Sequence, residues 1–143
     1  TLDPDTAHPR LLLSGDGKRV RWDGTPRIIP DHPKRFDSSR CVLGLQGFTS
    51  GRHYWEVQVA PGATTWALGV AKDPAVGIWA VGLCGGLCQA LASPSAVPLA
   101  LRRPPGLVGV FLDYEGGLVA FLDGEVPVFS YPGAVFGGEK VLP

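Results

Sequence analysis

Near its middle the sequence reads His53-Tyr54-Trp55-Glu56-Val57-Gln58-Val59, in which every second residue from Trp55 onward is apolar. In an extended chain successive side chains point to opposite faces, so the odd-numbered positions would share one face and the even-numbered positions the other. An antiparallel strand with one face in the core and one in solvent has this pattern. The stretch therefore predicts a half-buried strand that carries its tryptophan in the core.

Similar short runs recur along the chain, rich in Val, Leu, Trp, Phe and Tyr and bounded by Gly, Pro, Asp or Ser. The run 107–122 predicts a hairpin whose turn contains Gly116-Gly117, because glycine adopts positive φ readily. The best helical candidate, 87–101, is interrupted by prolines, so we expect no long helix. Closely spaced strands predict an all-β sandwich. The predicted strands are 10–13, 18–22, 41–45, 53–59, 65–71, 77–84, 87–91, 107–113, 117–122 and 126–131.

Composition limits the kinds of partner. The chain has 143 residues and 45% hydrophobic residues, enough to bury the core of one domain. It carries 13 basic and 13 acidic residues, so no net field attracts nucleic acid, and we expect no nucleic-acid partner. Gly or Pro interrupts the apolar runs well short of the ~20 residues of a membrane span, so we expect no direct membrane contact.

Neither metal binding nor catalysis has a motif in this sequence. The three cysteines, Cys41, Cys84 and Cys88, contain no Cys-x-x-Cys pair, and we interpret them as buried reduced thiols of a cytoplasmic protein. No nucleophile elbow surrounds a serine, and the glycine pairs do not open a helix. We expect no catalytic residue, no metal site and no cofactor; His53 is interpreted as a packing residue and Glu115 as a solvated turn residue.

Five segments carry a resemblance to a known family: Leu2-Asp3-Pro4, Arg35-Phe36-Asp37, Cys41-Val42-Leu43-Gly44, the run 48–57 and Leu112-Asp113-Tyr114-Glu115. In order and spacing they resemble the B30.2 domain, also called PRY-SPRY, found at the C-terminus of many tripartite-motif (TRIM) ubiquitin ligases, butyrophilins and pyrin. The resemblance covers nearly the whole chain. It implies a bent antiparallel β-sandwich of concanavalin-like SPRY fold with only short helical turns, built as a single domain over 1–143. Residues 1–47 would be its PRY part and residues 48–143 its SPRY part.

The sequence departs from this family at two places. Close relatives have a lysine-rich loop before a Gly-x-Trp motif, whereas here Pro74-Ala75-Val76 leads directly into Gly77-Ile78-Trp79. Relatives also continue into a closing strand beyond the positions of Val141-Leu142-Pro143. We therefore expect an internal loop to be missing near 74–77 and C-terminal strand residues to be absent.

The resemblance implies a module that recognises a protein or peptide and performs no catalysis in this chain. Family members hold their ligand in a shallow pocket walled by variable loops at one end of the sandwich, where recognition residues are commonly displayed. A single arginine in that region could pair with a carboxylate of the ligand. The corresponding residues here are Ser39, Arg40, Thr64, Thr65, Ala67, Trp79, Gly82 and Cys84.

Comparison with other members of the family disfavours two classes of ligand. An antibody-binding member has aromatic residues at the positions of Gly82 and Cys84 and an acidic residue at that of Ala67. Butyrophilins that sense phosphorylated metabolites have histidines at the positions of Ala67 and, approximately, Ser39. Because small residues replace these groups here, antibody Fc and phosphorylated metabolites are both disfavoured. A pocket that is deeper or weaker, filled by a peptide or chain terminus, fits better.

The parent protein is expected to be a TRIM-type E3 ubiquitin ligase in which this domain selects the substrate. Zinc would occur only in RING and B-box modules outside this chain, and oligomerisation would use a coiled coil, also outside it. Two alternatives are a butyrophilin-like receptor with this domain in its cytosolic tail and a pyrin-like innate-immune scaffold.

Overall fold

The chain forms two compact units in the computed structural model, which describes residues 1–72, 77–84, 87–92, 95–99 and 105–143. The N-terminal unit comprises Thr1–Gly47 with Leu142–Pro143, and the sandwich unit comprises Phe48–Val141. The division after Gly47 falls where the boundary between PRY and SPRY parts was predicted. That the two parts make a single domain stays a prediction, and the loop expected to be missing near 74–77 falls mostly on 73–76, outside the described residues.

Strands make up all the regular structure of the described residues, which confirms the predicted all-β class. They pair in three antiparallel sheets, and these residues include no helix long and apolar enough to cross a membrane. The strands are β1 (Leu11–Leu13), β2 (Val20–Trp22), β3 (Arg52–Gln58), β4 (Trp66–Lys72), β5 (Ile78–Cys84), β6 (Leu87–Ala92), β7 (Ser95–Pro98), β8 (Leu107–Asp113), β9 (Leu118–Asp123), β10 (Val126–Tyr131) and β11 (Val141–Leu142).

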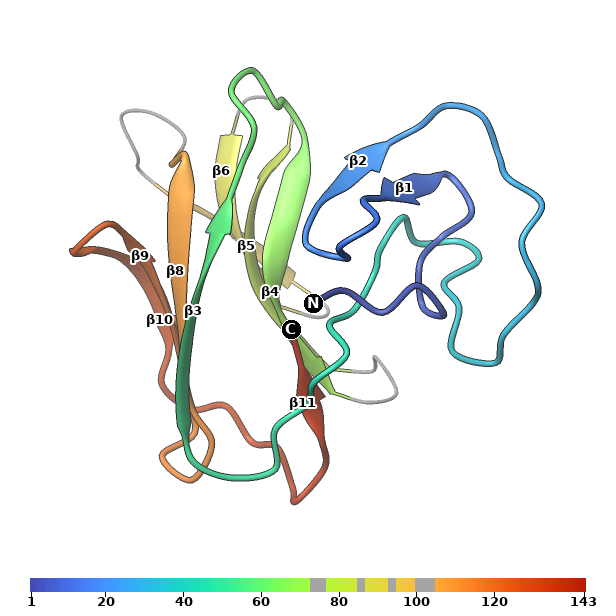
Figure 1. Cartoon of the computed structure of the whole chain (residues 1–143). Coiled ribbons are helices and arrows are strands. Elements are labelled where there is room, and N and C mark those ends of the chain that lie inside the picture. Colours follow the sequence, from blue (N-terminus) through green and yellow to red (C-terminus); the bar gives the residue numbers. More distant parts are fainter. Residues whose placement is uncertain (73–76, 85–86, 93–94, 100–104) are drawn as a thin grey trace. The chain divides into compact units, whose positions relative to one another are not determined.

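The sandwich unit is built from two sheets that face each other (Figure 1). One has the strand order β10-β9-β8-β3 and the other β11-β4-β5-β6-β7. Strand β3 alternates exposed and half-buried residues along its whole length, as its sequence predicts. Tyr131 of β10 links the sheets, because its hydroxyl donates to the backbone carbonyl of Ala80 in β5 at 2.8 Å. The core between the sheets includes Val70, Val81, Val108, Val110, Leu112, Val119 and Phe121.

The predicted hairpin at 107–122 is confirmed as β8 and β9, but its glycines have different roles. Gly117 has φ of 63°, as the turn requires, whereas Gly116 has no positive φ. The backbone N–H of Gly116 instead donates to the Asp113 carboxylate at 3.0 Å. A Cβ at Gly116 would lie 2.5 Å from that carboxylate. Gly116 is therefore suited to close approach rather than to a left-handed backbone.

Segment 41–45 was predicted as a strand, and this prediction is wrong. Its backbone groups bond to separate segments: the N–H of Leu43 donates to the Thr6 hydroxyl at 2.9 Å, and that of Gly44 to the Pro143 carbonyl at 2.8 Å. Only an isolated bridge, between Leu2 and Gly44, resembles strand pairing. Residues 1–3 share backbone bonds with this segment, such as the N–H of Asp3 to the Leu43 carbonyl and the N–H of Leu45 to the Thr1 carbonyl, both at 2.8 Å, but the bonds of Leu43 and Gly44 to Thr6 and Pro143 interrupt a regular ladder.

Two strands were not predicted, β7 and β11. Strand β7 ends in Pro98 and lies at the edge of the five-stranded sheet, where the missing N–H of proline is tolerated. Strand β11 has only two residues and lies at the opposite edge, next to β4. Both strands are too short to produce a recognisable alternation along the sequence.

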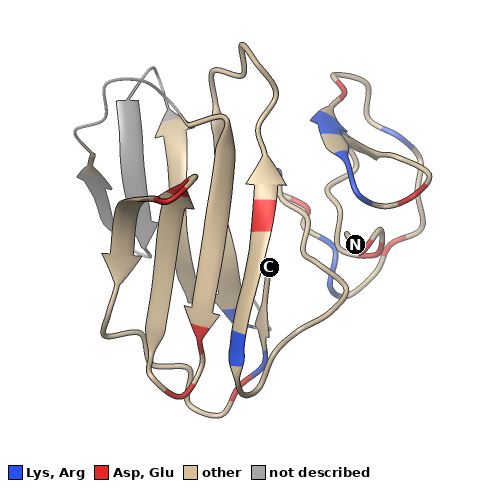
Figure 2. Ribbon diagram, turned by 60° about the vertical axis from the view of Figure 1, so that its left-hand side comes forward, with Lys and Arg blue, Asp and Glu red and all other residues tan. Residues whose placement is uncertain are grey.

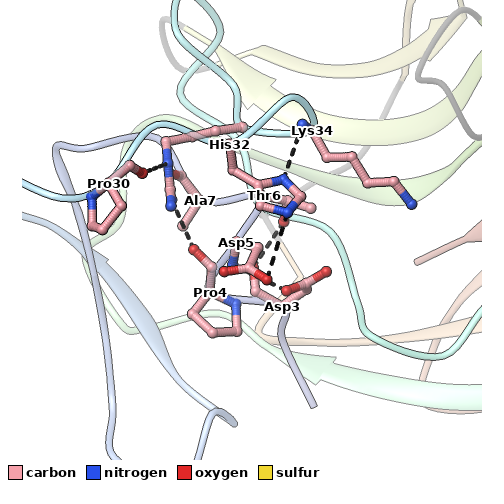
Figure 3. Close-up of polar contacts among 9 residues, drawn as sticks. Asp3, Pro4, Asp5, Thr6, Ala7, Pro30, His32 and Lys34 are labelled. Atoms are coloured by element: carbon pink, nitrogen blue, oxygen red, sulfur yellow. Dashed lines mark hydrogen bonds and ion pairs between the residues drawn. The ribbon is translucent and has the colours of Figure 1, made fainter.

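Arg35 organises the N-terminal unit through backbone carbonyl groups. Figure 3 labels the residues that supply these carbonyls, Pro4, Ala7 and Pro30. Its guanidinium donates to the carbonyls of Pro4 and Ala7 at 2.8 and 2.9 Å. It also donates to the carbonyl of Pro30 at 3.1 Å. These bonds tie together the two motifs around Pro4 and Arg35 that carry the family resemblance, so both motifs have a structural role here.

Candidate peptide-binding site

Ala67 and Gly82 are the two predicted site residues that the sandwich unit brings together. They are direct partners in the register of β4 and β5. Their neighbours Trp66 and Val81 pack against the core, so the alternation of a strand places Ala67 and Gly82 on the outer face of the sheet. Ala67 is exposed, whereas Gly82 is buried.

The absence of a side chain at Gly82 leaves no free space at the Cβ position. A Cβ built there would overlap the carbonyl oxygen of Trp66 and would lie 3.0 Å from Cα of Ala67. The neighbouring strand therefore occupies the space that a side chain would need. Of the two expectations for this region, a deeper pocket and a weaker one, the packing at Gly82 favours the second, and the pocket itself stays a prediction.

Trp79 lies on the other face of the same strand. It pairs with Val70 and packs against the core, with its ring 5.1 Å from that of Phe136 in an edge-to-face arrangement. It therefore does not share a face with Gly82. The Cys84 side chain, which was also assigned to the site, lies outside the described side chains.

Thr64 and Thr65 precede β4, at the end of the connection that leaves β3. Both are exposed, so their hydroxyl groups are available as hydrogen-bond donors and acceptors. The connection turns at Gly62, where φ is 81°, and closes with a bond from the N–H of Ala63 to the carbonyl of Ala60 at 3.2 Å. This turn places Thr64 and Thr65 directly before β4, the strand that contains Ala67.

Ser39 and Arg40 belong to the N-terminal unit, and both are exposed. The Arg40 guanidinium carbon lies 4.5 Å from the ring centroid of Trp22, a cation–π arrangement. Trp22 is 45% exposed. Stacking covers one flat face of a guanidinium and leaves its N–H edge able to bind a carboxylate. Trp22 was missed as a site residue because no local motif links positions so far apart.

Cys41 follows this pair, and its predicted burial is wrong. The Cys41 residue is exposed, and its thiol forms no disulfide. Although solvent reaches it, desolvation by the surrounding protein raises the pKa of the Cys41 thiol. The thiol is therefore mainly protonated near neutral pH, which disfavours a role as a nucleophile. The side chains of Cys84 and Cys88 lie outside the described part of the chain.

The packing role predicted for His53 is confirmed. Its ring stacks on Phe48, with the centroids 3.8 Å apart and an interplanar angle of 19°. Its Nε2 atom lies 2.7 Å from the backbone carbonyl of Ser50. Both contacts anchor the chain where it enters β3.

Glu115 has a structural contact beyond the solvation that was predicted for it. The backbone N–H of Gly51 donates to both of its carboxylate oxygens, at 3.1 and 2.9 Å. The N–H of Tyr114 donates to the carbonyl of Gly51 at 3.0 Å, so the two bonds clamp one glycine. Gly51 has φ of 84° and precedes β3. The acidic end of the Leu112–Glu115 motif thus fixes the turn that starts this strand.

Replacing Glu115 with alanine is expected to lower the free energy of unfolding by about 1–2 kcal/mol, because a charge-assisted bond to a backbone N–H is lost. Glu115→Gln keeps one acceptor oxygen and should fall between wild type and Glu115→Ala. Urea unfolding of the three proteins measures this series. As a control, Glu125→Ala removes a similar exposed carboxylate in the β9–β10 turn; equal losses for the two alanine variants would argue against the clamp.

Across residues 1–72, 77–84, 87–92, 95–99 and 105–143, no three His, Cys, Asp or Glu side chains form a group that could hold a metal ion. The expectation that the chain carries no cofactor stays an expectation. In the sandwich unit the candidate residues offer hydroxyl groups and an exposed small side chain, and in the N-terminal unit they offer one stacked guanidinium.

Two family models match the chain and together cover most of it. The PRY model, described as the SPRY-associated domain, matches residues 1–48, and the SPRY domain model matches residues 52–140. Among solved structures, the TRIM65 PSpry domain has a TM-score of 0.82 and 23% sequence identity, and the match covers 100% of this chain and 82% of that one. This likeness bears on the fold alone.

Curated relatives include both butyrophilins and ubiquitin ligases. Butyrophilin subfamily 1 member A1 of Mus musculus is 46% identical over 151 residues, covering 96% of this chain and 28% of the relative. The E3 ubiquitin-protein ligase TRIM58 of Homo sapiens is 50% identical over 133 residues, covering 84% of this chain and 27% of the relative. The chain thus spans less than a third of the length of either protein. By the two family models, it belongs to the SPRY domain family and carries a PRY segment ahead of its SPRY domain.

Proposed function

We propose that this chain is a protein- or peptide-recognition module that selects the substrate of a TRIM-type E3 ubiquitin ligase. The observation that carries the proposal is the exposed group Thr64, Thr65 and Ala67 at the start of β4. Neighbouring Trp66 is packed against the core, so this end of the strand is held rigidly. A rigid strand end with exposed small and polar residues suits recognition of an extended peptide.

The ligand is a peptide with a carboxylate, from a side chain or from a chain terminus. Arg40 supplies the cation, and its stacking on Trp22 reduces the entropy lost when the guanidinium binds. The threonine hydroxyls supply neutral hydrogen bonds.

Catalysis, metal binding and assembly are assigned to the rest of the parent protein. The module itself contributes no catalytic residue and no cofactor, and zinc belongs to RING and B-box modules elsewhere. The parent acts in the cytoplasm and oligomerises through a coiled coil. The identity of 50% to TRIM58 supports this assignment.

A butyrophilin-like receptor is the second candidate parent. Its support is the match to butyrophilin 1A1, which covers 96% of this chain, against 84% for TRIM58. In that protein the module would have the same recognition role within a cytosolic tail. The residues encoded upstream of Thr1 separate the candidates: cysteine and histidine spacings of zinc modules with heptads indicate a ligase, and an apolar span of ~20 residues indicates a receptor.

Peptide-display selection with the purified chain tests recognition directly. The wild type is compared with a double variant, Arg40→Ala and Ala67→Trp, which removes the charge and blocks the exposed strand end. We expect the wild type to enrich peptides with a shared acidic or C-terminal motif, and the double variant to lose this enrichment.

The matched control combines Arg21→Ala with Val135→Trp. Arg21 is an exposed arginine of β2 next to Trp22 in sequence, and Val135 is 72% exposed. This control protein should enrich the same motif as the wild type. Failure of the wild type to enrich any motif, or equal enrichment by the double variant, would contradict the proposed site.

A further inference from the structure

Strands β8 and β9 are apolar on both faces, although only one face lies in the core of the sandwich. Val110 and Phe121 represent the inward positions, which are fully buried. An antiparallel sheet with one solvated face normally alternates apolar and polar residues, whereas strands covered on both sides are continuously apolar. The outward positions of these two strands before the closing Asp113 are Leu107, Gly109, Phe111, Leu118, Ala120 and Leu122.

Three of these outward residues, Phe111, Ala120 and Leu122, line a shallow groove together with Tyr54 and residues 127–130 of β10, and we call it the β8–β9 groove. One row of cross-strand partners runs from Phe111 to Ala120 to Ser130. The next row runs from Gly109 to Leu122 and on to Pro127. An irregularity between Pro127 and Phe129 bends β10 at this point. The groove has a volume of about 450 Å³, large enough for several apolar side chains of a partner.

Tyr54 of β3 forms the wall of the groove. It is 54% exposed. A Cβ built on Gly109 would lie 2.5 Å from the Tyr54 hydroxyl and 2.9 Å from its ring, so the ring lies over this glycine. The hydroxyl donates to the Glu56 carboxylate at 3.2 Å. Desolvation raises the pKa of Tyr54, and this hydrogen bond raises it further, so the phenol stays neutral and continues to donate.

The Glu56 carboxylate lies beside the Tyr54 wall of the groove. Of the charged side chains on these four strands, Arg52 pairs with Asp113 at 3.5 Å, beyond the Tyr54 end of the groove. Within the part of the chain that the structure describes, no ion pair involves Glu56. Figure 2 shows the middle of the sheet largely free of basic residues, with acidic ones on β3 and at strand ends. A carboxylate beside an apolar groove is complementary to a cation carried by an apolar segment.

We propose that the β8–β9 groove is a second interaction surface, which binds a segment of a protein partner in which apolar residues flank lysine or arginine. The apolar side chains lie on Phe111 and Leu122. The basic side chain extends over the face of Tyr54 to the Glu56 carboxylate, where a cation–π contact and an ion pair are both within reach.

This surface is separate from the site proposed above. Ala67 lies on the outer face of the five-stranded sheet, whereas the groove lies on the outer face of the four-stranded sheet. The core lies between these two faces. One chain could therefore hold a substrate peptide and a second, basic partner at the same time.

Binding of synthetic peptides to the purified chain tests the groove. The probe is a fluorescent peptide in which leucine and phenylalanine alternate with arginine; matched peptides carry glutamine or glutamate in place of arginine. Fluorescence anisotropy should give the order arginine, glutamine, glutamate from tightest to weakest. Chemical-shift changes in ¹⁵N spectra should centre on Tyr54, Phe111 and Leu122.

Two exposed substitutions separate charge from shape. Glu56→Gln retains an acceptor for the Tyr54 hydroxyl but removes the charge. It should lower the affinity for the arginine peptide about fivefold and leave the affinity for the glutamine peptide unchanged. Pro127→Lys places a cation in the groove on an edge strand, where lysine is well tolerated, and should remove measurable binding of the arginine peptide. Asp31→Asn, an exposed carboxylate of the N-terminal unit, is the charge-matched control and should bind as the wild type does.

Several results would overturn the proposal. Equal affinity for the arginine and glutamate peptides would contradict the claim that the partner segment is basic. Unchanged affinity for the arginine peptide in Glu56→Gln would contradict it too. Concentration-dependent dimerisation of the wild type that Pro127→Lys abolishes would identify a second copy of the chain as the occupant. Loss of arginine-peptide binding in the Arg40→Ala, Ala67→Trp variant would place that binding at the first site. Because those two substitutions leave the groove intact, failure of either proposal is distinguishable from failure of the other.

Discussion

Phe121→Ala is expected to lower the free energy of unfolding by about 3–5 kcal/mol, because it removes a large side chain from a closely packed core and leaves a cavity. Phe121 is 0% exposed. Its ring centroid lies 6.2 Å from that of Tyr131 in an edge-to-face arrangement, and both residues pack between the two sheets. A domain of this size has a stability of about 5–15 kcal/mol, so the variant should lose much of it.

Urea unfolding followed by tryptophan fluorescence measures this loss. Val135→Ala is the control: Val135 is 72% exposed, so its truncation should change the free energy by less than about 0.5 kcal/mol. A loss below about 1 kcal/mol for Phe121→Ala would mean that the core collapses around the cavity or is loosely packed.

Gly69→Ala is the second substitution with a large expected effect, a loss of about 2–3 kcal/mol through overpacking against backbone. A Cβ at this position would overlap the carbonyl oxygen of Trp79 and would lie 2.6 Å from Cα of Ala80. Both obstructions are main-chain atoms of β5, which cannot rotate away as a flexible side chain can. To relieve the overlap, β4 and β5 would have to separate, and the register that pairs Ala67 with Gly82 would be disturbed.

Gly106→Ala adds the same methyl group in the same unit and serves as the control. Apart from its two chain neighbours, no atom of the described residues lies within 4 Å of a Cβ built on Gly106, and the residue has no positive φ, so the change should be neutral or slightly stabilising. Thermal unfolding of both variants, with peptide binding measured below the transition, tests the comparison. If both alanine variants proved equally stable, the close approach of β4 and β5 would not be a constraint on the fold.

Strands with a strong local pattern could be predicted, because the alternation of apolar and polar residues along the chain indicates which side chains are buried. The alternation from Trp55 to Val59 predicts β3, and turn glycines between apolar runs predict the β8–β9 hairpin. The prediction failed at 41–45, where Leu43 and Gly44 bond to two unrelated segments. Whether an apolar run becomes a strand there depends on which backbone lies beside it, and this is a property of the folded chain.

The candidate site divides in the same way. Exposure of Thr64, Thr65 and Ala67 follows from their place at the start of a strand whose next residues alternate into the core. The stacking of Arg40 on Trp22 does not follow from the sequence, because neither residue has a local signal that names the other. The same is true of Glu115, whose carboxylate binds the N–H of Gly51.

The sequence by itself determined the all-β class, the PRY and SPRY family and the strands with clear alternation, because these depend on periodicity and motif spacing. Only the tertiary structure decided that Gly82 is filled by its neighbour strand, that Arg40 rests on an indole, and that β8 and β9 leave an apolar face open beside Glu56. The physical reason is the separation along the chain of the residues that interact. Periodicity acts between neighbours along the chain, whereas close packing, stacking and uncovered faces depend on segments that meet only when the chain has folded.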